Sequence, residues 1–311
     1  MTGERHLVLG GCGFIGRNVV RHLVAAGHAV TVADRVPFQD DQQVAPIAFE
    51  VLELGTADWD RLLEGVDVVH HYVWASTPAS ANADPGRDLD INVGTTIALL
   101  DALRRRGGGR LVFSSSGGTV YGRIRHVPVA EDHPIAPITA YGTGKATAEL
   151  YLGLYRDMYG IDCRIARIAN PFGGNQSLVS GVGAVTTFIH RALAGDTIEI
   201  WGDGTVVRDY IFIDDVARCL TVLATRPSVD RFIYNIGSGG GLSLNDIVTE
   251  LETQVGHPLR VNRTPRRSFD VPISVLSIER AKQDLGWEPA YPFRIGVERT
   301  LSALRRSHEP S

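Results

Sequence analysis

The stretch Leu9-Gly10-Gly11-Cys12-Gly13-Phe14-Ile15-Gly16 decides the fold of this chain. It follows the apolar run Leu7-Val8-Leu9 and opens a helical pattern over residues 18–26, which places it at a strand-to-helix turn. Glycines at such a turn let the backbone approach a pyrophosphate, whose charge the N–H groups at the helix N-terminus stabilise. In this context the three glycines at positions 10, 13 and 16 are the dinucleotide-binding fingerprint of a Rossmann fold. We therefore expect the cofactor to contact Gly10, Gly13, Phe14, Ile15 and Gly16.

Asp34 narrows the identity of the cofactor. It stands 18 positions after Gly16, at the end of the next predicted strand. A carboxylate there can accept both ribose hydroxyls of an adenosine and repels a 2′-phosphate, which favours NAD over NADP. The neighbouring Arg35 weakens this preference, and we expect it to lie at the cofactor as well. Flavin binding stays open on these residues alone.

Short β-branched runs alternate with helical patterns through the first half of the chain. After the second strand, at residues 29–33, these segments are 66–69, 91–105, 111–113, 141–159 and 163–168. Such alternation is typical of a parallel sheet covered by helices on both faces. We predict an α/β fold, a Rossmann-type doubly wound parallel sheet with a smaller C-terminal α/β substrate lobe.

After residue 170 glycines cluster, and further helical patterns at 181–193, 214–224 and 244–255 are separated by short strands and loops. We therefore expect residues 1–169 to form an NAD-binding Rossmann domain, to which a later segment of about 205–236 returns. Residues 170–311 are expected to form mainly the substrate-binding lobe.

The composition is that of an ordinary globular protein. Hydrophobic residues make up 44% and charged residues 21% of the 311 residues, and the formal net charge is −4. This charge gives no basic surface for nucleic acid, and no apolar run reaches the roughly 18 residues of a membrane helix. The N-terminus shows no secretion signal. We therefore expect no nucleic-acid or membrane partner and a cytoplasmic location.

The three cysteines, Cys12, Cys163 and Cys219, lie far apart and are odd in number. They match neither a disulfide framework nor a zinc-binding spacing. This pattern is consistent with a reducing cytoplasm, and we expect no metal site.

Tyr141 and Lys145 stand at i and i+4 of a predicted helix, so the phenol and the ammonium share one face. A phenol is a poor base at neutral pH unless a nearby positive charge favours the phenolate. Lys145 and an oxidised nicotinamide can supply that charge, and Tyr141 would then remove a hydroxyl proton while hydride leaves the same carbon. Alone, the pair also fits a surface pair. The run Phe113-Ser114-Ser115-Ser116 favours the catalytic interpretation, because it ends a predicted core strand, where parallel strands face the ligand crevice.

Together these motifs resemble the extended short-chain dehydrogenase/reductases, in the branch of NAD-dependent nucleotide-sugar epimerases typified by UDP-glucose 4-epimerase. The resemblance covers nearly the whole chain. The family's glycine turn matches the three glycines above, with Leu9 where threonine is usual, and its Ser/Tyr/Lys set falls on Ser116, Tyr141 and Lys145. Its later motifs match Arg167-Ile168-Ala169-Asn170-Pro171-Phe172-Gly173, Trp201-Gly202-Asp203-Gly204, Arg208-Asp209-Tyr210-Ile211-Phe212-Ile213-Asp214-Asp215, and Arg267, Asp270 and Pro272.

The resemblance implies that the second lobe binds a UDP-sugar or a similar nucleotide sugar. Arg208 and Arg267 would bind its diphosphate, unless they form salt bridges to neighbouring aspartates, and Asn170 would hydrogen-bond a phosphate or sugar oxygen. This asparagine favours a sugar other than a uronic acid. The small Ser274 stands where a bulky side chain limits the pocket of some members, so it would admit an N-acetyl group. Further substrate contacts are expected from Ser116, Trp201 and Asp270.

Three segments depart from the family pattern. The segment Ser116-Gly117-Gly118-Thr119-Val120-Tyr121 is one residue longer than the commonest form, so either Ser115 or Ser116 is the family serine. Glu53 stands at or near the family's adenine-contacting aspartate, and we expect Glu53, Leu54 and Ser114 to contact the cofactor. The segment His71-Tyr72-Val73-Trp74 replaces His-Leu-Ala-Ala, which makes the pocket wall bulkier.

The residues after the serine discriminate among reactions of the family. Dehydratases and UDP-glucuronate decarboxylases that resemble this chain carry catalytic carboxylates there, whereas this chain has Gly117 and Gly118. We therefore expect an isomerase of carbohydrate metabolism, a UDP-hexose 4-epimerase with a tightly bound, recycled NAD, a 4-keto intermediate and Tyr141 as base. A nucleotide-sugar 4-ketoreductase and a catalytically silent NAD-binding protein remain the alternatives. By the same resemblance, helices at about 90–106 and 141–159 would form a homodimer contact.

Overall fold

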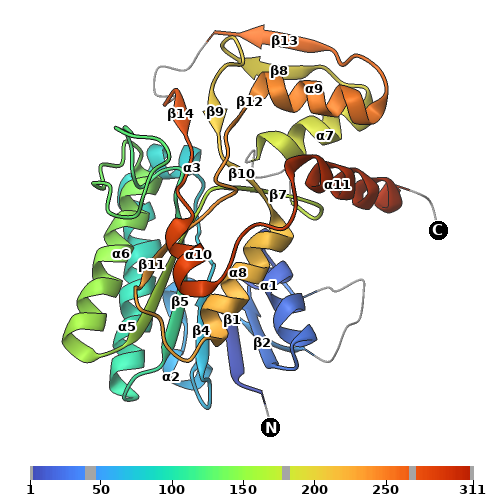
Figure 1. The fold of residues 1–311 in the computed structure, drawn as a ribbon. Helices are drawn as coiled ribbons and strands as arrows, with labels where there is room; N and C mark the ends of the chain where they lie inside the picture. Colours follow the sequence, from blue (N-terminus) through green and yellow to red (C-terminus); the bar gives the residue numbers. More distant parts are fainter. Residues whose placement is uncertain (1–2, 39–46, 177–182, 266–270, 309–311) are drawn as a thin grey trace.

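The computed structural model describes residues 3–38, 47–176, 183–265 and 271–308 (Figure 1). Its centre is a seven-stranded sheet in the order β11-β6-β5-β4-β1-β2-β3, and every pairing in it is parallel. The strands are β1 (Arg5–Leu9), β2 (Ala29–Asp34), β3 (Ala48–Val51), β4 (Val68–His71), β5 (Arg110–Ser116), β6 (Asp162–Ile168) and β11 (Ile233–Ile236). The strand order reverses between β1 and β4, where a doubly wound sheet has its ligand crevice. This confirms the predicted fold class.

Helices cover both faces of this sheet (Figure 1). The helices α1 (Phe14–Ala25) and α8 (Ile213–Thr225) pack on one face, and α2 (Trp59–Leu62), α5 (Gly94–Arg105) and α6 (Ala140–Tyr159) pack on the other. Side chains alternate along β1, so Val8 joins the core beneath α1 and α8 while Leu7 and Leu9 join the core beneath α5 and α6. Burial on both faces explains why these strands read as continuous apolar runs.

Shorter elements connect the strands. A 3-10 turn (Leu54–Thr56) follows β3, and α3 (Pro78–Ala83), α4 (Pro85–Asp88) and a π-helical turn (Leu89–Val93) lie between β4 and α5. The π turn runs directly into α5, so the predicted helix over 91–105 is present with a widened first turn.

Small sheets form a second region beyond the carboxyl ends of the central strands (Figure 1). They pair β7 (Asn170–Phe172) with β10 (Tyr210–Phe212), β8 (Ile198–Trp201) with β13 (Val261–Thr264), and β9 (Val207–Arg208) with β12 (Leu242–Ser243) and β14 (Ile273–Ser274). The helices α7 (Ala184–Ala194), α9 (Leu244–Val255) and α11 (Phe293–His308) pack with them, whereas α10 (Glu279–Leu285) lies beside β11. Because β10 leads directly into α8, the chain returns from this region to the large sheet.

The predicted strands and helices are present with ends that differ by a few residues. The helix predicted from residue 181 begins at Ala184 in the described part, and residues 181 and 182 lie outside it. The edge strand β3 was not predicted, because it is short and partly exposed. No helix among the described residues has the length and apolar character needed to cross a membrane.

Candidate active site

A cleft of ≈ 1080 Å³ lies at the carboxyl ends of β1, β4, β5 and β6. Its walls come from the large sheet on one side and from the small sheets and α7 on the other. It brings together these residues predicted from the sequence: Gly10, Gly13, Phe14, Ile15, Gly16, Ser115, Ser116, Tyr141, Asn170, Trp201 and Arg208. The two halves of the chain therefore contribute to one site.

The glycine turn has the shape of a phosphate cradle. A Cβ on Gly16 would lie 2.2 Å from the carbonyl oxygen of Gly10, and a Cβ on Gly10 would lie 2.7 Å from the backbone nitrogen of Val73. Gly13 is the N-cap of α1, and within the described part of the chain no side chain caps it. The first N–H groups of α1 thus remain for an anionic ligand, and the turn fits the pyrophosphate of a dinucleotide.

Arg17 is a residue of this turn that the sequence analysis missed. It lies on the first turn of α1, lines the cleft, and donates from Nε and Nη2 to the carbonyl oxygen of Cys12 at 3.3 and 3.1 Å. The fingerprint gave no signal for it, because the motif needs only backbone donors. Its guanidinium adds a positive charge to the edge of the cradle.

The residues predicted around the adenosine lie at the side of the turn and do not line the cleft itself. Asp34 ends β2, and its carboxylate accepts the N–H of Cys12 at 3.0 Å and that of Arg35 at 2.7 Å. These bonds fix the carboxylate, and each oxygen keeps a second lone pair for a ribose hydroxyl. Arg35 and Glu53 are exposed, and the carbonyl oxygen of Leu54 accepts the hydroxyl of Thr95 at 3.4 Å.

Tyr141 and Lys145 lie one turn apart on α6, next to the end of β5. Tyr141 lines the cleft, and Lys145 is buried behind it with Nζ donating to the carbonyl oxygen of Ser114 at 2.7 Å. Trp74 contacts both of them: the Lys145 ammonium lies 3.8 Å from the Trp74 ring centroid, and the Trp74 ring meets that of Tyr141 edge-on at 6.2 Å. Of the bulky segment noted in the sequence, Tyr72 lines the cleft, and Trp74 is a cation–π partner of the lysine.

The protein alone keeps the phenol neutral. Burial raises the pKa of Tyr141 to about 12, and the nearby Asp88 carboxylate adds to the rise. Burial lowers the pKa of Lys145 to about 7, although the carboxylates of Glu149 and Asp88 oppose this. Desolvation therefore outweighs the charge of Lys145 in the protein without cofactor, so the second positive charge expected from the sequence is needed. The oxidised nicotinamide of a bound NAD would supply the remaining positive charge.

Asp88 is a second residue that the sequence analysis missed. It is buried at the end of α4, where its Oδ1 accepts Asn92 Nδ2 at 2.8 Å and also the hydroxyl of Ser76. Its Oδ2 lies close to α6, 3.0 Å from where a Cβ on Gly144 would be. The signal available in the sequence was an aspartate and an asparagine at i and i+4, facing the same side of a helical segment.

We expect Asp88→Asn to move the acid limb of the kcat/KM profile to lower pH. The change removes a negative neighbour that raises the pKa of both Tyr141 and Lys145, so both groups lose their protons at lower pH. Activity below the midpoint of the limb should rise severalfold, as measured by steady-state kinetics across pH. The exposed Asp90→Asn is the control and should leave the profile in place. An unmoved limb in Asp88→Asn would show that this carboxylate has no influence on the base.

The three serines at the end of β5 have different surroundings. The hydroxyl of Ser115 donates to the carboxylate of Glu149, which also holds Arg167 at 2.6 Å. Ser114 is buried and donates to a backbone oxygen of β4 at 3.4 Å, away from the cleft. Ser116 is partly exposed and lines the cleft. The geometry therefore favours Ser116 over Ser115 for contact with a bound molecule.

The far wall of the cleft carries the polar residues predicted for substrate. The amide of Asn170 donates to the carbonyl oxygen of Asp209 at 2.9 Å, and Arg208 donates to that of Val271 at 2.7 Å. A smaller cavity beside Gly118 is lined by both Arg208 and Ser274, which brings Ser274 to the same wall. The predicted Arg267 and Asp270 lie outside the described residues.

Most of the residues described above lie in a stretch of the chain, up to the end of β11, that matches the model of a known family. The model of the NAD dependent epimerase/dehydratase family matches residues 6–237. The chain belongs to this family. This confirms the family expected from the motifs, and with it NAD as the cofactor.

Relatives of this chain are similar to it over their full length. A UDP-glucose 4-epimerase of Mycolicibacterium smegmatis is 33% identical over 313 residues, covering 98% of this chain and 100% of that protein. The crystal structure of a Thermotoga maritima UDP-glucose 4-epimerase with UDP-glucose has a TM-score of 0.91 at 30% identity, covering 98% and 100% of the two chains. That of a Thermus thermophilus UDP-glucose 4-epimerase with NAD has a TM-score of 0.87 at 30% identity, covering 97% and 99%.

Burial of Lys145 should make the stability of the folded chain depend on pH. With a folded pKa of about 7 and an ordinary value of 10.5, the unfolded chain binds more protons between pH 7 and 10, so stability rises with pH in that window. Lys145→Met lacks this contribution. Its free energy of unfolding should therefore rise less steeply with pH than that of the wild type, by up to about 1.4 kcal/mol per pH unit. Urea unfolding at pH 7, 8 and 9 measures it.

Lys282→Met is the matched control for this experiment. Lys282 is exposed and its pKa is raised by Glu288, so its loss leaves the pH 7–9 slope unchanged. Equal slopes for wild type and Lys145→Met would contradict the lowered pKa of Lys145.

Proposed function

We propose that this protein is an NAD-dependent 4-epimerase of a nucleotide sugar, with a UDP-hexose as substrate. The observation that carries the proposal is one cleft that holds the glycine turn, Tyr141 and Ser116 on one wall and Arg208 on the other. The named UDP-glucose 4-epimerases among its full-length relatives support the same activity.

The proposed reaction uses few groups of the chain. Tyr141 takes the proton of the C4 hydroxyl while Ser116 hydrogen-bonds the same oxygen, and Lys145 contributes positive charge behind the phenol. A bound NAD supplies the acceptor for the C4 hydride and later returns it. After the 4-keto sugar rotates in the cleft, the hydride would return to the opposite face of C4 and Tyr141 would give the proton back to the C4 oxygen, which leaves C4 with inverted configuration.

The space after Ser116 supports epimerisation over elimination. A Cβ on Gly117 would lie 2.5 Å from Cδ1 of Leu276 and 3.2 Å from the carbonyl oxygen of Arg167, so a side chain at this position would have to displace the buried Leu276. Gly118 faces open space among the described residues but brings no side chain. The extra acid and base that dehydration requires are therefore missing at both places.

In this proposal each of the two parts of the chain binds a different ligand. Residues 1–169, with the returning segment at about 205–236, bind NAD, and residues 170–311 bind mainly the nucleotide sugar. Arg208 and Arg267 bind the diphosphate, and Asn170, Trp201 and Asp270 contact the rest of the substrate. The small Ser274 beside Gly118 leaves room for an N-acetyl group on the sugar.

Whether the protein retains NAD or consumes added NADH distinguishes the proposed epimerase from a 4-ketoreductase. Protein as purified should release NAD on denaturation and should interconvert UDP-glucose and UDP-galactose without added dinucleotide. Assays with UDP-N-acetylglucosamine and UDP-glucuronate in parallel define the sugar. Stoichiometric oxidation of added NADH by a nucleotide 4-keto sugar, without interconversion of UDP-glucose and UDP-galactose, would instead establish a 4-ketoreductase. NAD release without turnover of any sugar would establish a silent binding protein.

We also propose a homodimer through α5 and α6, in the cytoplasm. Leu150, Leu154 and Met158 follow one another at i+4 along α6 and are 70%, 45% and 61% exposed, which is the apolar stripe that a helix-pair contact requires. The three cysteines are free thiols, as a reducing compartment maintains them.

We expect Leu154→Arg to convert the dimer to a monomer, because it places a charge in the centre of the apolar stripe. Light scattering after size-exclusion chromatography would report about half the wild-type mass. The exposed Val51→Arg, on the edge strand β3, is the control and should remain dimeric. A monomeric wild type would refute the dimer outright.

A further inference from the structure

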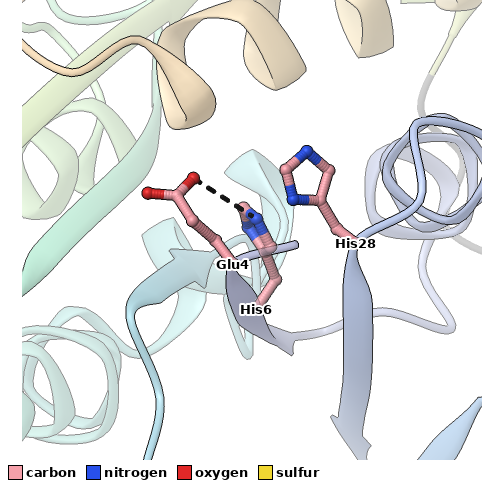
Figure 2. Close-up of side chains that lie close together, drawn as sticks. All are labelled: Glu4, His6 and His28. Carbon is pink, nitrogen blue, oxygen red and sulfur yellow. Dashed lines mark ion pairs between the residues drawn. The ribbon is translucent and has the colours of Figure 1, made fainter. Parts of the chain in front are cut away.

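Three side chains with metal-binding donor atoms form a cluster at the amino ends of β1 and β2, whereas the cleft lies at the carboxyl ends of the strands (Figure 2). Glu4 precedes β1, His6 lies within β1, and His28 precedes β2. One donor atom from each lies within 4.8 Å of the others. The sequence analysis expected no metal because it considered cysteine spacing, whereas this set is assembled by the parallel pairing of β1 and β2.

Two imidazole nitrogens of this cluster have no hydrogen-bond partner among the described residues. His6 is only 1% exposed, and its Nε2 has no hydrogen bond among the described residues; the same holds for the buried Nδ1 of His28. A buried imidazole nitrogen without a partner costs free energy in an apolar setting. Nε2 of His6 faces Oε2 of Glu4 at 3.9 Å, which is too long for a hydrogen bond (Figure 2). A shared cation would satisfy these atoms together.

The distances suit a small divalent ion. Zinc bonds to histidine nitrogen and carboxylate oxygen at about 2.0–2.2 Å, so two ligands at a tetrahedral angle lie roughly 3.4 Å apart. The Glu4–His6 pair must close from 3.9 Å by about half an ångström, and donor atoms up to 4.8 Å apart must close by up to about 1.4 Å. The partly exposed side chains of Glu4 and His28 can make these movements. The same exposure gives an ion a route from solvent, and a water would complete the tetrahedron.

Outer hydrogen bonds orient the proposed ligands. Oε1 of Glu4 accepts Arg110 Nη1 at 3.1 Å, which turns Oε2 toward His6. Nδ1 of His6 lies 2.9 Å from Nε2 of His70, whose own Nδ1 lies 2.7 Å from the hydroxyl of Tyr72. Metal ligation at Nε2 would place the His6 proton on Nδ1, which then donates to Nε2 of His70. Nδ1 of His70 in turn donates to the hydroxyl of Tyr72, a residue of the cleft wall.

We propose that Glu4, His6 and His28 bind one Zn²⁺ or a similar borderline divalent transition metal, remote from the catalytic residues. Imidazole and carboxylate donors suit this class of ion, and the set of two nitrogens and one oxygen leaves a fourth position for water. The ion would tie the beginnings of β1 and β2 together and stabilise the folded chain.

The test is metal titration of the full, untagged chain as purified, treated with a chelator and exchanged into metal-free buffer. Co²⁺ should give the visible absorption bands of a four-coordinate ion at one per chain, and Zn²⁺ should displace it and raise the melting temperature. His28→Gln and Glu4→Gln should each weaken Zn²⁺ binding at least about tenfold, and the exposed His257→Gln should not change it. Far-UV circular dichroism confirms that each variant is folded.

Three results would overturn the proposal. One is the lack of saturable Co²⁺ or Zn²⁺ binding at micromolar concentration. Another is binding that His28→Gln and Glu4→Gln leave unchanged. The third is a near-UV thiolate-to-cobalt band, which would place the ion on a cysteine such as the partly exposed Cys12.

Discussion

Tyr141→Phe is expected to lower kcat about 10³-fold while the protein still purifies with NAD. The substitution removes the only atom of Tyr141 that can take the C4 proton, and positioned acid–base groups contribute about 10²–10⁴-fold. The phenyl ring keeps its edge contact with Trp74, so the cleft retains its shape. Loss of one hydroxyl from the site costs NAD only about 1 kcal/mol of binding. Turnover of UDP-glucose and NAD released by denaturation are the two measurements.

Tyr151→Phe serves as the control for this prediction. Tyr151 lies on the same helix, packs against the core beneath α5 and α6, and does not line the cleft. Its loss should leave kcat within a factor of about two, because such a change touches packing only slightly. Activity of Tyr141→Phe near the wild-type value would mean that another group removes the proton.

Gly16→Ala is expected to abolish NAD retention and, with it, activity. The new Cβ would lie 2.2 Å from the carbonyl oxygen of Gly10 and 2.7 Å from Cα of Gly11. Both are backbone atoms, so the turn itself must move, and the N–H groups of α1 no longer converge on the pyrophosphate. Bound NAD per chain should fall at least tenfold, and kcat should fall with it.

Gly94→Ala is the matched control. Gly94 begins α5, and a Cβ there meets no atom within 4 Å among the described residues. The helix propensity of alanine should leave this variant as stable as the wild type or more so. Full NAD content in Gly16→Ala would contradict the role given to the turn.

The fold could be predicted from the sequence because its signals are local. The glycine turn lies within eight residues, and Asp34 follows at a distance fixed by one helix and one strand. Buried parallel strands also carry continuous apolar runs, which β1 and β5 show. The edge strand β3 was not predicted, because it is only four residues long and none of its residues is fully buried, so it carries no continuous apolar run.

The surroundings of the catalytic residues could not be predicted, because they depend on contacts between distant segments. Asp88 reaches α6 only after α4 packs on it, and no spacing rule relates Asp88 to Tyr141. Lys145 lies in sequence beside Tyr141, but its pKa depends on burial against Trp74 and on Glu149, which only the folded chain provides. The cluster of Glu4, His6 and His28 likewise exists only through strand pairing.

Isotope retention at C4 tests the proposed 4-epimerisation most directly. UDP-glucose deuterated at C4 is incubated with the purified protein in ordinary water without added dinucleotide, and the UDP-galactose formed is analysed by mass spectrometry and NMR. Hydride transfer to a retained NAD and back predicts that the deuterium remains at C4 of the product. Loss of the deuterium to solvent, or conversion only when NADH is added, would contradict the account.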